Sequence, residues 1–209
     1  MVWRKPLGAF GKQLPRSSPT LWNIGYHKEF YWDGRSPSLE KQALAAWTGA
    51  NMGAKADEIA AKLNALQGYR AQFQKVFDSG ATPDSIVKSI AAFERTIISS
   101  NTAWDRAHAG EQSALNESAT RGWNIFQAIK CNNCHDGVLF TDLQYHNVGI
   151  GMDQEEPDVG RLKLRINRKI PAHSRHRRCA TLRSRRPTFT TGALLLSRTR
   201  SISCLVVES

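Results

Sequence analysis

Hydrophobic residues along the first 130 positions recur at helical spacing rather than in alternation. Ser38 is placed to cap a helix over 38–47, because its hydroxyl can accept a hydrogen bond from a backbone N–H of the first turn. A second helical pattern covers 55–77, where we expect Gly68 to break or kink the helix. The apolar positions of this pattern are Ile59, Leu63, Leu66, Phe73, Val76 and Phe77.

Two more helices follow. Thr82 is predicted as an N-cap with Pro83 in the first helical position. The side chains expected to be buried on this helix are Ile86, Ile90, Phe93 and Ile97. Another helix is predicted over 113–130. No segment alternates well enough for a sheet, so the predicted fold class is all-α with long connecting loops.

Length and hydropathy set further limits. A chain of 209 residues can form one or two small domains with a real core. No apolar stretch is long enough to span a membrane. The first residues include Arg4 and Lys5 with no apolar segment behind them, so we expect no signal peptide in this chain.

The positive charge is confined to the end of the chain. Residues 161–209 hold 13 basic residues and one acid, Glu208, whereas the first 160 hold 16 basic and 17 acidic residues. The tail therefore accounts for the whole net charge of +11. One interpretation is an arm for nucleic acid or another anionic partner. The other is a tail that is not an evolved sequence.

The most specific motif is Cys131-Asn132-Asn133-Cys134-His135. This C-x-x-C-H pattern is typical of covalent haem c attachment, with the histidine as proximal iron ligand. A zinc knuckle would need two further ligands at the right spacing, and Cys179 and Cys204 form no second pair. A redox pair should follow a strand, whereas 122–130 is predicted to be helical. We favour haem.

The surrounding segments carry a resemblance. They are RSSPTLWN (16–23), FYWDGRSPSLEKQA (30–43), IAAFERT (90–96), GWNIF (122–126), DGVLFTD (136–142) and YHNVG (145–149). Together they closely resemble the bacterial di-haem cytochrome c peroxidase family, which includes the methylamine-utilisation di-haem enzymes. The resemblance runs from about Leu14 to Leu164.

The resemblance implies cytochrome c-like haem domains. Residues 1–98 would be the remnant of the N-terminal, peroxidatic domain without its haem motif. Residues 99–160 would be an incomplete C-terminal haem domain, and 161–209 a disordered basic tail. The family is periplasmic, and a homodimer is compatible with it. Calcium binds between its domains at an asparagine, where this chain has Ser17.

The implied activity is reduction of hydrogen peroxide with electrons from a small cytochrome c or cupredoxin. Cys131, Cys134 and His135 would hold the electron-accepting haem. Because the chain contains a single C-x-x-C-H, we expect it to be truncated and inactive as written. The alternative is a mono-haem c-type electron carrier. A basic nucleic-acid-binding protein is a further alternative that rests only on the tail, and we expect no nucleic-acid partner.

Three more residues match family sites. Trp32 matches a tryptophan between the two haems, although an aromatic here could equally be plain core. Gln42 matches an active-site glutamine, against the alternative of a solvated helix residue. Asn51 stands where the family has its catalytic glutamate, and an amide cannot shuttle a proton.

The resemblance says less about the other side chains around the electron-accepting haem, which is the second haem of the family along the chain. His146, beside Tyr145, could bond a haem propionate, but we favour a structural role for it. The family's distal methionine has no match before the tail. Met52 and Met152 are poor substitutes, Met152 being the only local one.

The tail contains a hidden match to the family. Residues 178–193 can be written in codons that, one frame over, spell Leu-Arg-Asn-Val-Ala-Leu-Thr-Ala-Pro-Tyr-Phe-His-Asp-Gly-Ser. The family has this type of segment at this distance after its second haem. We infer a frameshift between about residues 160 and 173, after which the tail is out of frame and not expected to fold.

Overall fold

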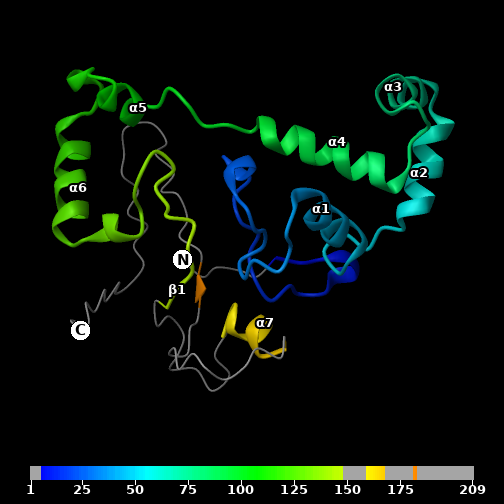
Figure 1. Cartoon of the computed structure of the whole chain (residues 1–209), viewed down its shortest axis with the longest axis horizontal. Coiled ribbons are helices and arrows are strands. Elements are labelled where there is room, and N and C mark those ends of the chain that lie inside the picture. The colour runs from blue at the N-terminus through cyan, green and yellow to red at the C-terminus, as the bar shows by residue number, and fades with distance from the viewer. Residues whose placement is uncertain (1–5, 148–158, 168–180, 183–209) are drawn as a thin grey trace. The chain divides into compact units, whose positions relative to one another are not determined.

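A computed structural model describes residues 6–147, 159–167 and 181–182 (Figure 1). The chain divides into two compact units, Met1–Ile98 and Ser99–Ser209, called unit 1 and unit 2 below. Which haem domain each unit represents, and the further division predicted at residue 160, stay predictions. The described elements are helices apart from one two-residue strand pair, which confirms the all-α fold class.

Unit 1 consists of short helices around one longer helix, α4. Its elements are η1 (Ala9–Gly11), η2 (Ile24–Tyr26), α1 (Leu39–Thr48), α2 (Ala56–Ala65), α3 (Gln67–Phe77) and α4 (Pro83–Thr96). Helices α1 and α2 and the turn η2 all pack against α4 (Figure 1). Helix α4 is therefore the element on which unit 1 is assembled.

The helix starts follow from their capping residues. The Ser38 hydroxyl accepts a hydrogen bond of 3.2 Å from the Lys41 N–H, which starts α1 where the sequence predicts it. Thr82 and Ser85 form a reciprocal capping box at the start of α4, and Pro83 occupies its first turn. These two predictions are confirmed.

The predicted break of the 55–77 helix lies elsewhere than at Gly68. Helix α2 ends and α3 begins at Leu66, whose backbone is extended (φ −91°, ψ 111°), and Gly68 lies inside α3. The Leu66 N–H closes the last turn of α2, and its carbonyl accepts the first α3 bond from Arg70. A single residue outside the helical region thus turns α3 so that Phe73 returns to the core.

Unit 1 has two groups of buried apolar side chains. The first is Ala43, Trp47, Ala60, Phe73, Ala81, Ile86 and Val87. The second is Ile24, Phe30, Leu39 and Ala91. Asn64 ties α2 to the α3–α4 loop, because its side-chain amide bonds both the N–H (2.7 Å) and the carbonyl (2.8 Å) of Ala81.

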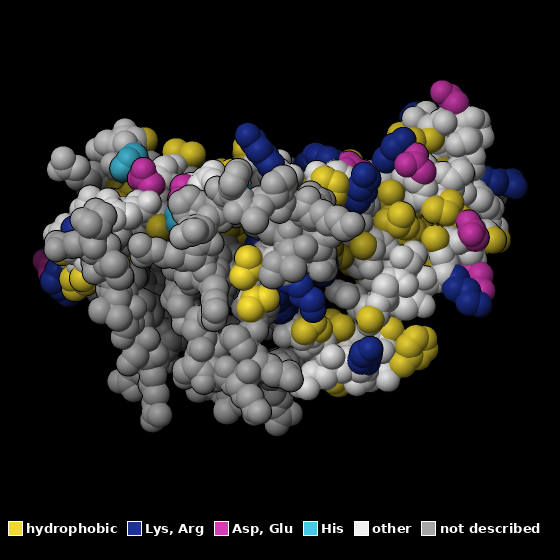
Figure 2. Space-filling model, turned by 60° about the horizontal axis from the view of Figure 1, so that its bottom comes forward, with side chains coloured by type: hydrophobic (Ala, Val, Ile, Leu, Met, Phe, Trp, Pro, Cys, Tyr) yellow, Lys and Arg dark blue, Asp and Glu magenta, His cyan; other side chains and the backbone are white. Residues whose placement is uncertain are grey.

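The buried face of α4 differs from the predicted one. Ile86 is buried as expected, but Phe93 is 67% exposed and Ile90 is 38% exposed, so their predicted burial is wrong. The inward face instead runs over Val87 and Ala91 to Glu94. Ala91 is fully buried, and its small side chain lets α1 and η2 approach the helix closely. Hydrophobic side chains consequently stand among charged ones on the surface (Figure 2).

The described residues of unit 2 include two α-helices, α5 and α6, within the predicted haem domain (99–160) and a third, α7, in the tail. The elements of unit 2 are α5 (Ala103–His108), η3 (Gln112–Ala114), α6 (Glu117–Ala128), η4 (Cys131–Asn133), β1 (His146–Asn147), α7 (Leu162–Asn167) and β2 (Thr181–Leu182). The helix predicted over 113–130 begins later, because the Asn116 side chain caps α6 by accepting from the Ala119 N–H at 2.8 Å. Strands β1 and β2 pair antiparallel.

Most of the basic tail lies outside the described residues. Helix α7 and strand β2 are its described parts, and the predicted disorder and frameshift concern residues that are otherwise outside them. Within the described ranges, no helix combines the length and apolar character needed to cross a membrane.

Candidate functional site

Helix α6 delivers the C-x-x-C-H motif on a single tight turn. The helix ends at Ala128, and Lys130 adopts a left-handed backbone (φ 59°) that redirects the chain into η4. The Cys131 carbonyl accepts hydrogen bonds from the N–H groups of Cys134 (3.3 Å) and His135 (3.0 Å). Both cysteines are half-buried thiols. Two sulfur nucleophiles and an imidazole therefore share one turn.

The His135 ring is held through one nitrogen. Its Nδ1 lies 3.2 Å from the carbonyl oxygen of Phe140, a residue that is 2% exposed. A carbonyl can only accept, so this contact requires the proton on Nδ1 and leaves the Nε2 lone pair for a metal. Metal-binding histidines are oriented by this kind of bond.

The loop after the motif is closed by backbone hydrogen bonds. The Thr141 N–H donates to the Asp136 carbonyl (2.9 Å), and the Asp142 N–H donates to the Cys134 carbonyl (3.1 Å). Phe140 has a positive φ of 50°, which is costly for a bulky side chain. The closed loop holds Phe140 in this conformation, with its carbonyl directed at His135.

An aromatic cluster adjoins the motif. Trp123 of α6 lies 4.3 Å from Trp104 of α5 and 5.5 Å from Phe126, between ring centroids. Phe140 lies edge-on to Trp104 at 5.1 Å, and Phe126 is 6.1 Å from the His135 ring. Yet α6 contains no buried residue, and its Ile125 is 57% exposed.

These features fit a haem. The donor set supplies two thiols for thioether bonds and an oriented imidazole for the iron. The large, planar, apolar macrocycle would cover aromatic and aliphatic side chains that the unit itself does not bury. The residues present therefore match the group that the motif predicts.

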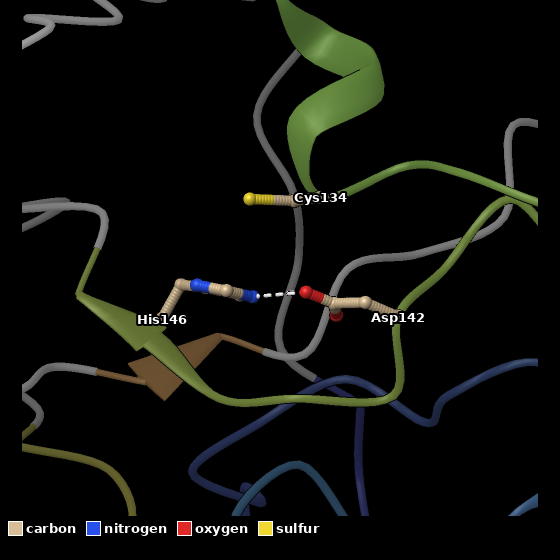
Figure 3. A group of neighbouring side chains, drawn as sticks. All are labelled: Cys134, Asp142 and His146. Atoms are coloured by element: carbon tan, nitrogen blue, oxygen red, sulfur yellow. Dashed lines mark hydrogen bonds and ion pairs between the residues drawn. The ribbon is translucent and has the colours of Figure 1, made fainter.

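A second group of potential ligands combines Cys134 of the motif with two residues of the segment that follows it (Figure 3). Asp142 and His146 are joined by a 2.7 Å contact between Oδ2 and Nε2. The Cys134 sulfur and these two ligand atoms all lie within 4.8 Å of one another. Partial burial opposes ionisation of Asp142, but hydrogen bonds from the Gln144 N–H and the His146 ring outweigh it and lower the pKa of the carboxyl.

Sequence reasoning missed Asp142. It lies within the DGVLFTD segment, but nothing in that segment marks it as a partner of His146. An acid four residues before a histidine is informative on a helix, whereas here the two lie in a loop and in β1. The structure gives His146 a carboxylate partner, and its alternative role beside a haem propionate stays a prediction.

Trp32 lies in unit 1 on a tight loop closed by hydrogen bonds between Phe30 and Ser36. Its indole Nε1 donates to the Ser17 carbonyl at 2.6 Å. The neighbouring Asp33 is 8% exposed and pairs with both Arg16 (3.1 Å) and Arg35 (3.0 Å). The structure thus brings Trp32 and Ser17 together; a calcium role for Ser17 stays a prediction.

The remaining candidates lie on or near α1. Gln42 is half-buried on α1. Its backbone carbonyl accepts a 3.3 Å hydrogen bond from the Tyr31 hydroxyl, so Gln42 borders the Trp32 loop. Asn51 is exposed beyond the end of α1. Its backbone carbonyl accepts a hydrogen bond of 3.0 Å from the Ala9 N–H. Met52 is 65% exposed, and Met152 lies outside the described residues.

Comparisons with curated proteins identify relatives whose names agree with the resemblance seen in the sequence. The chain is 33% identical over 161 residues to "Methylamine utilization protein MauG" of Methylophilus methylotrophus, covering 75% of this chain and 47% of that protein. It is 32% identical over 165 residues to "Cytochrome c551 peroxidase" of Nitrosomonas europaea, covering 77% and 49%. It therefore spans about half the length of the curated relatives it matches.

Solved structures share the fold. A MauG-like protein associated with microbial copper homeostasis aligns with a TM-score of 0.72, at 22% identity, over 88% of this chain and 58% of that one. The di-haem peroxidase BthA from Burkholderia thailandensis aligns with a TM-score of 0.65, at 21% identity, over 87% and 54%.

The family described as "Di-haem cytochrome c peroxidase" matches residues 4–113. This match ends before Cys131, so the C-x-x-C-H motif is an independent observation. The matched segment is more than half of the sequence, and the chain belongs to the di-haem cytochrome c peroxidase family.

Proposed function

We propose that this chain binds one haem covalently through Cys131 and Cys134, with His135 as the proximal ligand. The observation that carries the proposal is the 3.2 Å contact between His135 Nδ1 and the Phe140 carbonyl, which leaves Nε2 available as a ligand. The open apolar face of α6 supports it, because such a helix needs a further surface to cover it. When bound, the haem supplies a one-electron carrier.

The chain's own residues would then set the environment of this site. The Phe140 carbonyl makes the imidazole of His135 more electron-rich by polarising its N–H bond. The aromatic rings of Trp104, Trp123 and Phe126 offer an apolar surface on one side of the site, which a bound haem would cover. A dry, apolar environment and a basic ligand both influence the potential of a haem.

We further propose that the chain forms part of a periplasmic enzyme that reduces hydrogen peroxide. Two electrons and two protons convert one peroxide to two waters, and a small cytochrome c or cupredoxin would supply the electrons. The names of the curated relatives support this class of reaction. The fixed indole of Trp32 supports its proposed role in electron transfer, because an immobilised aromatic reorganises little.

The 209 residues alone are proposed to be inactive as a peroxidase. They contain a single C-x-x-C-H, assigned by resemblance to the electron-accepting haem. Asn51, at the proposed position of the catalytic glutamate, is exposed and carries an amide that cannot transfer a proton. A mono-haem electron carrier is the second candidate, which the single motif favours for this stretch by itself.

Haem attachment can be tested by export of the chain in a host with haem-ligation machinery. The wild-type chain should retain one haem after denaturation and extraction, and Cys131→Ala/Cys134→Ala should retain none. Cys179→Ala/Cys204→Ala is the matched control and should behave like the wild type. His135→Ala should keep the covalent link but change the absorption spectrum of the haem. Covalent haem in the Cys131→Ala/Cys134→Ala chain would contradict the assignment.

Catalysis can be tested on the purified, haem-loaded chain with peroxide and a reduced donor cytochrome. We expect donor oxidation no faster than with an equal concentration of free haem. Turnover within the range typical of enzymes, about 1–10³ s⁻¹, would show that these residues suffice for peroxide reduction. Oxidation and re-reduction of the haem without peroxide turnover would favour the carrier.

A further inference from the structure

We propose that, before haem is attached, Cys134, Asp142 and His146 form a binding site for one divalent metal ion, with Zn²⁺ the best match. This site shares Cys134 with haem attachment but binds its sulfur as a thiolate rather than as a thioether. It also omits Cys131 and His135, the other two residues of the C-x-x-C-H motif.

The geometry brings three ligand types together from three segments. Cys134 follows η4, Asp142 lies in the closed loop, and His146 belongs to β1 (Figure 3). Their ligand atoms all lie within 4.8 Å of one another. Zinc–ligand bonds of about 2.0–2.3 Å in a tetrahedron place ligand atoms about 3.3–3.6 Å apart. Side-chain adjustments of about 1 Å would therefore close the site.

The backbone already holds these segments in place. The Asp142 N–H donates to the Cys134 carbonyl at 3.1 Å, so two ligand residues are linked through their main chains. Strand β1 is paired with β2, with His146 opposite Leu182. Little backbone ordering is left for the metal to impose, which favours binding.

The charges suit a zinc ion. An aspartate side chain is ionised at neutral pH, so Asp142 would supply a carboxylate oxygen. A thiolate and a carboxylate together balance the two positive charges, and a neutral imidazole adds a third bond. Metal binding would replace the Asp142–His146 hydrogen bond, with the imidazole proton moving to Nδ1 so that Nε2 can coordinate. Water would complete a four-coordinate site.

Metal and haem would compete for Cys134. In thioether formation the S–H adds across a vinyl C=C bond; sulfur bonds to one carbon and the hydrogen goes to the other, with no net redox change. The product sulfur is uncharged and is a far weaker zinc ligand. A bound Zn²⁺ would therefore protect this thiol from reaction and delay haem attachment.

The test uses the full chain, produced without haem and kept reduced, with Cys179→Ser/Cys204→Ser so that its only thiols are Cys131 and Cys134. Titration with Co²⁺ should give a thiolate-to-cobalt absorption band that saturates at one equivalent, and Zn²⁺ should displace the cobalt. Cys134→Ser should abolish the band. Asp142→Asn and His146→Gln should each weaken Zn²⁺ binding by at least about tenfold.

Matched variants separate this site from other zinc arrangements. Cys131→Ser and Asp136→Asn should bind Zn²⁺ as the parent chain does. Equal losses in Cys131→Ser and Cys134→Ser would instead assign the metal to the C-x-x-C pair and overturn the proposal. Absence of a saturable cobalt band would overturn it as well.

One measurement needs no change at a ligand residue, so it tests the site even if the ligand variants fail to fold. It uses the parent chain, which carries only Cys179→Ser/Cys204→Ser. Zn²⁺ should slow alkylation of Cys134 by at least about tenfold, as followed by mass spectrometry of the Cys131 and Cys134 positions, while Cys131 changes little. Equal protection of both thiols, or of neither, would contradict the site. Because haem takes no part, failure here leaves the haem proposal standing.

Discussion

The two units of this chain differ in how they bury apolar surface. Unit 1 contains nearly all the hydrophobic side chains that are buried within the described residues, including Leu39, Trp47 and Ala91. In unit 2 the exception is Phe140. Helix α6, the longest described helix of unit 2, has no buried residue although Trp123, Ile125 and Phe126 all lie on it.

In the described residues, the helices of unit 1 bury side chains against one another, whereas the aromatic side chains of α6 in unit 2 stay half-exposed. In unit 1, helices cover one another, and hydrophobic burial at about 25 cal/mol per Å² supports the packing. In unit 2, aromatic rings contact one another but stay half-exposed, beside the C-x-x-C-H turn. We infer that packing between helices stabilises unit 1, and that the proposed haem would add to the stability of unit 2 by covering side chains that its described residues leave half-exposed.

The largest effect is expected in the core of unit 1. Trp47→Ala should destabilise this unit by about 3–5 kcal/mol, because it removes a large side chain that is 8% exposed. Phe93→Ala is the matched control; Phe93 is 67% exposed, and we expect a change within about 0.5 kcal/mol. Amide hydrogen exchange, which resolves the units, should show the loss in α4 and not in α6. Equal losses in both helices would mean that the two units unfold together.

A smaller effect should depend on haem. In the haem-free chain Trp123→Ala should cost about 0.5–1.5 kcal/mol, the scale of lost aromatic contacts, because Trp123 is only half-buried. In the haem-loaded chain the same change should cost more, since the macrocycle would bury the ring. Denaturant unfolding of both forms, each compared with its own parent, measures the difference. The same cost in both forms would contradict the idea that haem completes the core of unit 2.

The smallest effect concerns Glu94, a buried carboxyl of unit 1. Burial raises its pKa, with the neighbouring Arg95 acting in the opposite direction, and its Oε2 has no hydrogen-bond partner in the described part of the chain. A raised folded-state pKa favours the folded chain below the unfolded value of 4.5, and this advantage is lost as the pH rises through the folded pKa. Glu94→Gln should therefore stabilise unit 1 at neutral pH.

The pH profile distinguishes this cause from a packing effect. The gain from Glu94→Gln should shrink as the pH falls toward 4, where the native carboxyl is itself neutral, and thermal unfolding across this range measures it. Glu58→Gln, a change at an exposed residue of α2, should leave the stability nearly unchanged at neutral pH. A gain from Glu94→Gln that is the same at all pH values would exclude desolvation of the carboxylate as its cause.

Features that depend on neighbouring residues were predictable from the sequence. The starts of α1 and α4 follow from Ser38 and Thr82, because a cap bonds N–H groups only two or three residues away. The helix before the C-x-x-C-H motif was predicted over 113–130, whereas α6 covers the shorter range Glu117–Ala128 behind the Asn116 cap. The motif itself consists of adjacent residues, so its chemistry can be inferred without a fold.

Features that depend on distant segments were decided by the tertiary structure. Periodicity identified α4 as amphipathic, but the fully buried Ala91, which permits close packing by α1 and η2, determined that Phe93 points outward. Composition likewise did not distinguish Asp142 from other acids. Its approach to Cys134 and His146 required the loop to close, by one backbone hydrogen bond between residues eight positions apart and one between residues five apart. Local hydrogen bonding thus determined where the helices begin, and long-range packing determined which side chains meet.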